Sequence, residues 1–129
     1  MGIIKNLFGD KDVAVNKSAI NWTNLESMTD VEGMIDQSEC NTIIVFKHSN
    51  RCGISGSVLR RFEGHAMNYP NDKFLYYFLN VLKHRNISNE ISLKFSIHHE
   101  SPQLIIIKNK EVVAHNSHYE ILNIDLSGY

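Results

Sequence analysis

The sequence contains only two cysteines among 129 residues, too few for the disulfide framework that stabilises small secreted domains. It has no apolar run near the roughly 18 residues that a membrane-spanning helix needs. Its start, Met1–Gly9, is too short and too interrupted for a secretory signal. We therefore expect a cytoplasmic protein that is reduced at rest and binds no membrane.

The sequence also has no large excess of positive or negative charge. The 13 Lys and Arg residues are matched by 14 Asp and Glu residues, for a formal net charge of −1. Nucleic-acid-binding domains carry a basic face, so we expect no nucleic acid partner. The hydrophobic content of 43% is enough for one core. Because Gly9-Asp10-Lys11-Asp12 interrupts the pattern near the start, residues 1–19 are predicted to be an N-terminal leader and residues 20–129 one domain.

The patterning that is present alternates between helix and strand. Apolar residues recur at helical spacing from Asn24 to Glu39, and a continuous β-branched run follows from Thr42 to Lys47. The further predicted elements are a short strand near Trp22, a helix over Cys52–Met67, a strand over Phe74–Leu82, a helix through Phe95 capped by Asn86 or Ser88, strands Gln103–Lys108 and Glu111–His115 joined by Asn109-Lys110, and a last helix from Ser117. This order predicts an α/β fold with a central mixed sheet of four to five strands flanked by helices on both faces.

Cys52 follows the first buried strand, at the predicted start of a helix. The thiolate is the nucleophile in disulfide exchange, and a helix N-terminus stabilises it through free N–H groups and the helix dipole. Arg51 adds a neighbouring cation, and Gly53 lets a partner approach closely. The pattern therefore predicts a catalytic Cys52, against the alternative of a small, buried structural cysteine.

Ser55 stands where a dithiol enzyme would have its second cysteine. We predict that its hydroxyl donates to the Cys52 thiolate; the alternative is a hydrogen bond within the first helical turn. In either case Cys-Gly-Ile-Ser cannot close an intramolecular disulfide, so the mechanism is monothiol. Cys40 lies at the other end of the predicted strand, on the order of 20 Å away. We assign Cys40 a structural role.

Several strings resemble one known family. They are Trp22, Phe46-Lys47-His48-Ser49 before Cys52, Ser88-Asn89-Glu90-Ile91, His99-Glu100-Ser101-Pro102-Gln103, and Ser117-His118. Over about residues 20–125 the chain resembles the monothiol bacilliredoxin (YtxJ-like) family of the thioredoxin superfamily. Gly53 is a departure, because this family often has Cys-Pro-Ile-Ser, and it makes the turn after the cysteine more flexible.

The resemblance implies a thioredoxin-like fold in which Pro102 is cis. It also implies that Cys52 removes a low-molecular-weight thiol, such as bacillithiol, from mixed disulfides of S-thiolated client proteins. The small thiol would be a co-substrate, with no permanently bound cofactor and no metal, and the chain a monomer or weak dimer. We predict that Arg51, Gly53, Ile54, Ser101 and Pro102 contact the substrate. A cis proline exposes the preceding backbone for pairing with an extended partner, whereas an ordinary trans proline before a strand would not.

Two other functions stay open. Cys-Gly-Ile-Ser is close to the Cys-Gly-Phe-Ser of monothiol glutaredoxins, in which two cysteines and two small thiols hold an iron–sulfur cluster. Those proteins carry Gly-Gly-x-Asp after the hairpin, where this chain has residues 114–118, Ala-His-Asn-Ser-His. A redox-inactive scaffold that binds partners through the proline loop is the third possibility. The histidines lack a recognised metal-site spacing, but His115 and His118 are candidate contacts for a bound thiol.

Overall fold

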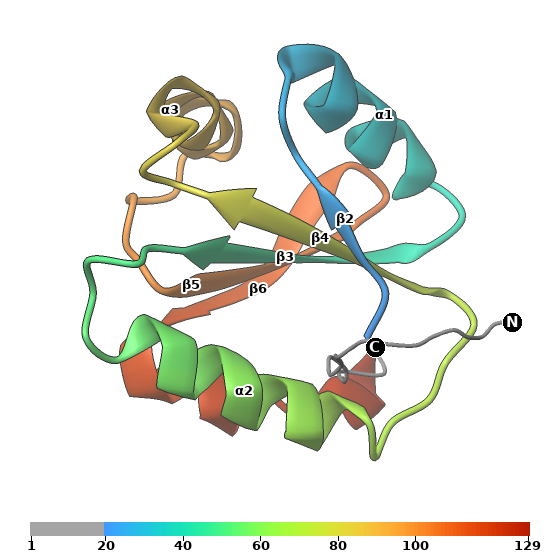
Figure 1. Ribbon diagram of the computed structural model, residues 1–129. Coiled ribbons are helices and arrows are strands. Elements are labelled where there is room, and N and C mark those ends of the chain that lie inside the picture. Colours follow the sequence, from blue (N-terminus) through green and yellow to red (C-terminus); the bar gives the residue numbers. More distant parts are fainter. Residues whose placement is uncertain (1–19) are drawn as a thin grey trace, which may run out of the picture.

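A computed structural model describes residues 20–129, so the predicted leader lies outside the described residues. Five strands form one mixed sheet in the order β2-β4-β3-β5-β6 (Figure 1). They are β2 (Trp22–Asn24), β3 (Thr42–His48), β4 (Phe74–Asn80), β5 (Gln103–Lys108) and β6 (Glu111–Ser117). The strands β2, β3 and β4 are parallel, whereas β5 runs antiparallel to β3 and β6 antiparallel to β5. This confirms the predicted α/β fold and its mixed sheet.

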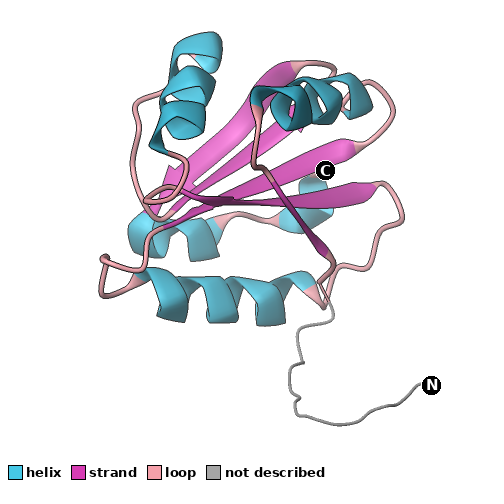
Figure 2. Cartoon of the chain, turned by 45° about the horizontal axis from the view of Figure 1, so that its top comes forward, coloured by secondary structure: helices cyan, strands magenta, loops and turns pink. Residues whose placement is uncertain are grey.

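Helices cover both faces of the sheet (Figures 1 and 2). The helices α1 (Met28–Gln37) and α3 (Arg85–Phe95) lie on one face, and α2 (Ser55–Ala66) lies on the other with the 3₁₀ helices η2 (His118–Asn123) and η3 (Leu126–Gly128). The central strand β3 contributes to both cores because its side chains alternate. Ile43 and Val45 pack toward α1 and α3, while Ile44 and Phe46 pack toward α2.

Some predicted boundaries at the start of the domain are wrong. The first helix begins at Met28 rather than Asn24 because Trp22–Asn24 pairs with β4 as a short edge strand, close to the position expected for it. Ser27 caps α1, and its hydroxyl accepts the Asp30 N–H at 3.1 Å. Polar groups that bind the backbone set this helix start, whereas apolar spacing indicates only which face is buried.

Boundaries later in the chain shift for similar reasons. The strand β4 ends at Asn80, whose side chain accepts the backbone N–H groups of Leu82 and Lys83 and so turns the chain. The N-cap of α3 is His84, so neither Asn86 nor Ser88 caps it. The predicted last helix is present only as the two 3₁₀ segments η2 and η3. The strand β6 continues to Ser117, two residues beyond the predicted end.

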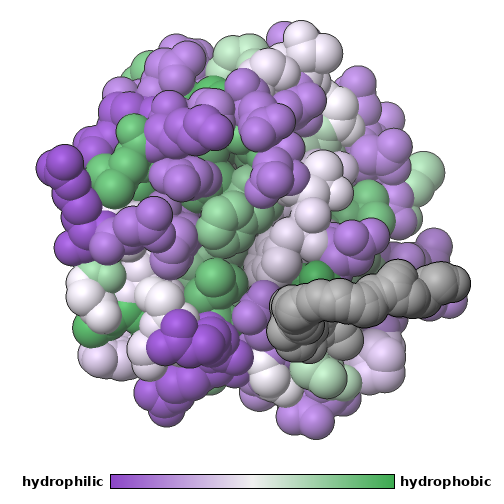
Figure 3. Space-filling view, viewed as in Figure 1, coloured by the Kyte–Doolittle hydropathy of each residue, from purple (hydrophilic) through white to green (hydrophobic). Residues whose placement is uncertain are grey.

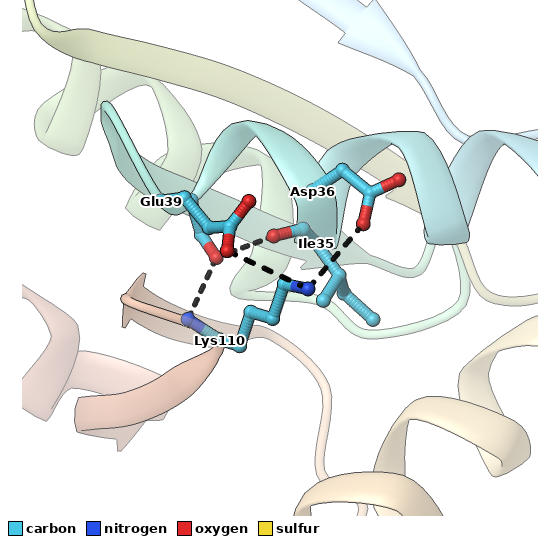
Figure 4. Close-up of polar contacts among 5 residues, drawn as sticks. Ile35, Asp36, Glu39 and Lys110 are labelled. Atoms are coloured by element: carbon cyan, nitrogen blue, oxygen red, sulfur yellow. Dashed lines mark hydrogen bonds and ion pairs between the residues drawn. The ribbon is translucent and has the colours of Figure 1, made fainter.

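One end of the sheet is fixed by the hairpin between β5 and β6. Asn109 and Lys110 have φ angles of 52° and 66°, as a tight turn that follows the strand twist requires. The Lys110 N–H donates to Ser38 Oγ at 2.8 Å, and its ammonium lies 3.8 Å from Asp36 and 3.7 Å from Glu39 at the end of α1 (Figure 4). The turn is thereby held to the helix above it.

Cys40 also lies at this end of the sheet, two residues before β3, and it is exposed. Its side chain belongs to neither core cluster, so the structural role predicted for Cys40 is not that of a core residue. In the turn that follows α1, the Cys40 N–H donates to the Gln37 carbonyl at 3.1 Å. The thiol of Cys40 remains on the protein surface. The two cysteines flank opposite ends of β3.

Trp22 ties the edge strand β2 to the face that carries α2. Its ring packs on Tyr76, Phe46 and Phe78 at centroid distances of 5.4, 6.2 and 6.0 Å. Its indole N–H donates to Glu63 Oε2 of α2 at 2.7 Å. On the side of the molecule where β2 lies, apolar residues show between hydrophilic rims (Figure 3).

Within residues 20–129, no helix has the length and apolar character that a membrane crossing requires.

Candidate active site

Cys52 lies in the turn that joins β3 to α2. Its N–H donates to the Ser49 carbonyl at 3.2 Å, and its own carbonyl accepts the Ser55 N–H at 3.2 Å. The helix begins at Ser55 with Ile54 as N-cap. The prediction that the helix starts at Cys52 is therefore wrong: the thiol precedes the helix, because the residues after β3 are used to turn the chain toward the other face.

The thiol is accessible from solvent. Cys52 is half-buried and lines a cavity of about 520 Å³, bounded by the turn after β3 and by the start of α2. Arg51 and Gly53, its two neighbours, are exposed, whereas Ile54 packs against the core beside α2. This placement excludes the alternative of a cysteine buried in the core.

Ser55, in the position of a second cysteine, is completely buried. Its oxygen lies 2.8 Å from His48 Nδ1 and accepts the Ser49 N–H at 3.3 Å. His48 Nε2 faces the Asn50 Oδ1 acceptor at 2.8 Å, so Nε2 carries the proton and Nδ1 accepts the Ser55 O–H. No hydrogen bond joins Ser55 Oγ to Cys52 Sγ within the described residues. Ser55 therefore holds the turn that carries the thiol.

The proline loop lies at the same end of the sheet. The Ser101–Pro102 peptide is cis, as the resemblance implied. Lys47 pairs with Gln103 across β3 and β5, which places Pro102 next to the last residue of β3. Pro102 is buried and its carbonyl accepts the His118 N–H at 3.0 Å. The hydroxyl of Ser101 is buried and has no partner among residues 20–129.

The two candidate histidines are placed differently. His118 Nδ1 lies 3.6 Å from Glu100 Oε1, which brings its exposed ring beside the proline loop. His115 is exposed within β6 and pairs with Ile105. This pair lies two positions along the ladder from the pair Gln103–Ser117, next to the proline loop. Among residues 20–129, no three His, Cys, Asp or Glu side chains gather as a metal site would need.

A buried cation lies behind the proline loop. Lys47 is fully buried, and its Nζ lies 3.4 Å from the Ser88 carbonyl, 3.3 Å from Ser92 Oγ and 3.4 Å from His99 Nδ1. The three N–H groups of an ammonium thus have three acceptors. Burial lowers the pKa of Lys47 from 10.5 to about 8, because a charge is costly to desolvate.

His99 completes this cluster. Burial, and then the positive charge of Lys47, lower the pKa of His99, so the imidazole is held neutral with Nδ1 as acceptor. Ser88 Oγ lies 2.9 Å from the same nitrogen. The cluster connects β3, α3 and the loop before Pro102. A lysine at the end of an otherwise apolar strand, as in residues 43–47, was the available sequence signal for it.

The model of the family described as monothiol bacilliredoxin BrxC matches residues 23–126. The chain belongs to the monothiol bacilliredoxin family. The chain is accordingly a thiol-disulfide oxidoreductase.

Solved structures agree with the fold. One, described as a candidate oxidoreductase with a thioredoxin fold, is 28% identical, covers 79% of this chain and 88% of its own, and gives a TM-score of 0.68. Thioredoxin from Malassezia sympodialis (Mala s 13) is 13% identical, with 87% and 90% covered and a TM-score of 0.65. Thioredoxin from Fasciola hepatica is 20% identical, with 78% and 91% covered and a TM-score of 0.58. The bacilliredoxin thus has the thioredoxin-like fold predicted for it.

Proposed function

We propose that this bacilliredoxin uses Cys52 to remove a low-molecular-weight thiol, bacillithiol or a close analogue, from mixed disulfides on client proteins. The observation that carries the proposal is the contrast between two positions of one motif. Cys52 lines an open cavity, while Ser55 is completely buried and hydrogen-bonded. A thiol that can be reached, with no second thiol beside it, suits exchange with a small thiol.

The first step transfers the small thiol. The Cys52 thiolate attacks the sulfur that belongs to the small thiol, and a disulfide forms between the two. The original disulfide breaks, its electron pair leaves with the client sulfur, and that sulfur takes a proton from water. A second small thiol, as thiolate, then attacks the adduct on Cys52. A disulfide of two small thiols leaves and Cys52 is restored, so the client sulfur is reduced while the second small thiol is oxidised; the first was already part of a disulfide.

The client is held by the proline loop. The backbone of Ser101, ahead of the cis Pro102, pairs with an extended client segment by main-chain hydrogen bonds. Arg51, Gly53 and Ile54 are the neighbours of Cys52 in the chain and contact the substrate beside the sulfur. The small thiol is a co-substrate that leaves after each cycle, and the protein acts as a monomer or weak dimer without a permanently bound cofactor.

The test compares two cysteine variants. A client peptide carrying a small thiol on its cysteine is mixed with wild type, Cys52→Ser and Cys40→Ser, and release of the free peptide thiol is followed. We expect Cys52→Ser to abolish release and Cys40→Ser to keep the wild-type rate, because Cys40 lies at the opposite end of β3. Equal losses in both variants would contradict the proposal.

A further inference from the structure

The cavity beside Cys52 is an unassigned feature of the site. It has a volume of about 520 Å³, within the range of pockets that hold small organic molecules. Its wall is formed by the turn after β3 and by α2, which starts beneath the end of that strand (Figure 1). Cys52 and Arg60 both line it, and none of the lining residues is acidic.

Gly56 gives Arg60 its place in this wall. The two residues are one helical turn apart and therefore share a face of α2. A Cβ at Gly56 would lie 3.3 Å from Arg60 Nη1, closer than an ordinary van der Waals contact. The guanidinium is thus folded back over Gly56, toward the start of the helix. A Cβ at Gly64, in the last turns of α2, would have no side chain from beyond its chain neighbours within 4 Å.

The Arg60 guanidinium has no counter-charge in the described part of the chain. No ion pair or hydrogen bond joins its side chain to any of residues 20–129. Arginine stays charged at any ordinary pH, and its planar fork of donors matches a carboxylate. The nearby helix N-terminus adds a partial positive charge. The part of the cavity lined by Arg60 therefore attracts an anion.

We propose that this cavity binds a carboxylate of the small thiol through Arg60 while the sulfur of the same molecule reaches Cys52. The inference rests on the proposed function and deepens it by naming the residue that recognises the charge of the small thiol. Arg60 acts as a specificity-determining residue, since it distinguishes charged from neutral thiols. Gly56 keeps the cavity open and the guanidinium in position.

The experiment uses pairs of substrates that differ in charge alone. A client peptide carries 3-mercaptopropionate or its amide on its cysteine, and a second pair carries 6-mercaptohexanoate or its amide to vary the reach. The quantity compared is the ratio of kcat/KM for acid and amide. For wild type we expect a ratio of roughly three to ten in at least one pair, as a partly solvated charge-assisted contact gives. Arg60→Gln should bring the ratio to about one.

Arg61→Gln is the matched control. It removes the same charge from the neighbouring position of the same helix, but Arg61 does not line the cavity. We expect it to keep the wild-type ratio. The inference is overturned if Arg60→Gln keeps the ratio, if Arg61→Gln loses it equally, or if wild type shows no preference at either length. Failure of the proposed function looks different, because then no substrate, acid or amide, is turned over.

A second pair of variants tests the cavity apart from its charge. Gly56→Leu fills the space between Arg60 and the turn, whereas Gly64→Leu adds the same side chain at an exposed position of α2. Leucine favours helix over glycine, so both variants should melt at or above the wild-type temperature. We expect Gly56→Leu to raise the KM for the client peptide that carries the small thiol, and Gly64→Leu to leave that KM unchanged. An unchanged KM in a folded Gly56→Leu protein would overturn the site.

Discussion

The Ser55 hydroxyl lies 2.8 Å from His48 Nδ1 and donates its proton to that nitrogen. This contact joins the first residue of α2 to the last residue of β3 across the turn that carries Cys52. The residue in the position of a second cysteine is therefore a brace for the turn. Because its proton is directed to His48, Ser55 supports the thiol by position and not by a hydrogen bond to it.

Loss of this brace should destabilise the protein. Ser55→Ala leaves the buried Ser49 N–H and His48 Nδ1 without their partner, which costs about 1–3 kcal/mol in the free energy of unfolding. Ser57→Ala, in the same turn of α2, is the control and should change it by less than about 0.5 kcal/mol. Urea unfolding at neutral pH measures both. Equal effects would show that Ser55 is not a brace.

The buried Lys47 makes stability depend on pH in an unusual direction. Its pKa in the folded protein is about 8, below the 10.5 of an unfolded chain. Below pH 8 both states hold the proton, and the native state bears the full cost of burying the charge. Between pH 8 and 10.5 the unfolded state binds more protons, so this residue makes stability rise with pH. The lowering corresponds to roughly 3 kcal/mol.

Lys47→Met removes this dependence while keeping the shape of the side chain. We expect the stability of wild type relative to Lys47→Met to increase from pH 7.5 to 10.5, measured by urea unfolding across that range. Lys94→Met, at an exposed position of α3, serves as control and should give a curve parallel to wild type. If Lys47→Met also runs parallel to wild type, the lysine does not titrate in this range.

Trp22 provides a probe of the edge strand, since it is the only tryptophan in the sequence. Its N–H donates to Glu63 Oε2 at 2.7 Å. Glu63→Ala should cost about 1–3 kcal/mol, as for hydrogen bonds to charged groups, and shift the fluorescence emission to the red as the indole meets water. Glu63→Gln keeps an acceptor and should lose less. Glu32→Ala, exposed on α1, should leave the emission unchanged, and a shift there would contradict the contact.

The sequence was enough to predict the sheet and the place of the thiol. The β-branched run from Thr42 to Lys47 predicted a strand buried on both faces, and Cys52 lies in the turn just beyond the end of that strand. Asn109-Lys110 is a weaker hairpin signal than Asn-Gly, yet these two residues form the turn between β5 and β6. Local patterns sufficed because each of these features depends on neighbours in the chain.

Features that depend on distant segments could not be predicted. Apolar spacing showed which face of α2 is buried but not that the helix starts at Ser55, since the turn hydrogen bonds with Ser49 decide that. The environment of Lys47 depends on α3, more than 40 residues further along the chain.

The most direct test of Cys52 as acceptor of the small thiol is mass spectrometry of the digested protein after a single turnover. Cys40→Ser protein is mixed with a client peptide that carries the small thiol, quenched with acid, and digested. The expected result is a mass increase equal to the small thiol on the peptide that contains Cys52, together with free client thiol. Client peptide retained on Cys52, or free client thiol with no adduct on Cys52, would contradict it.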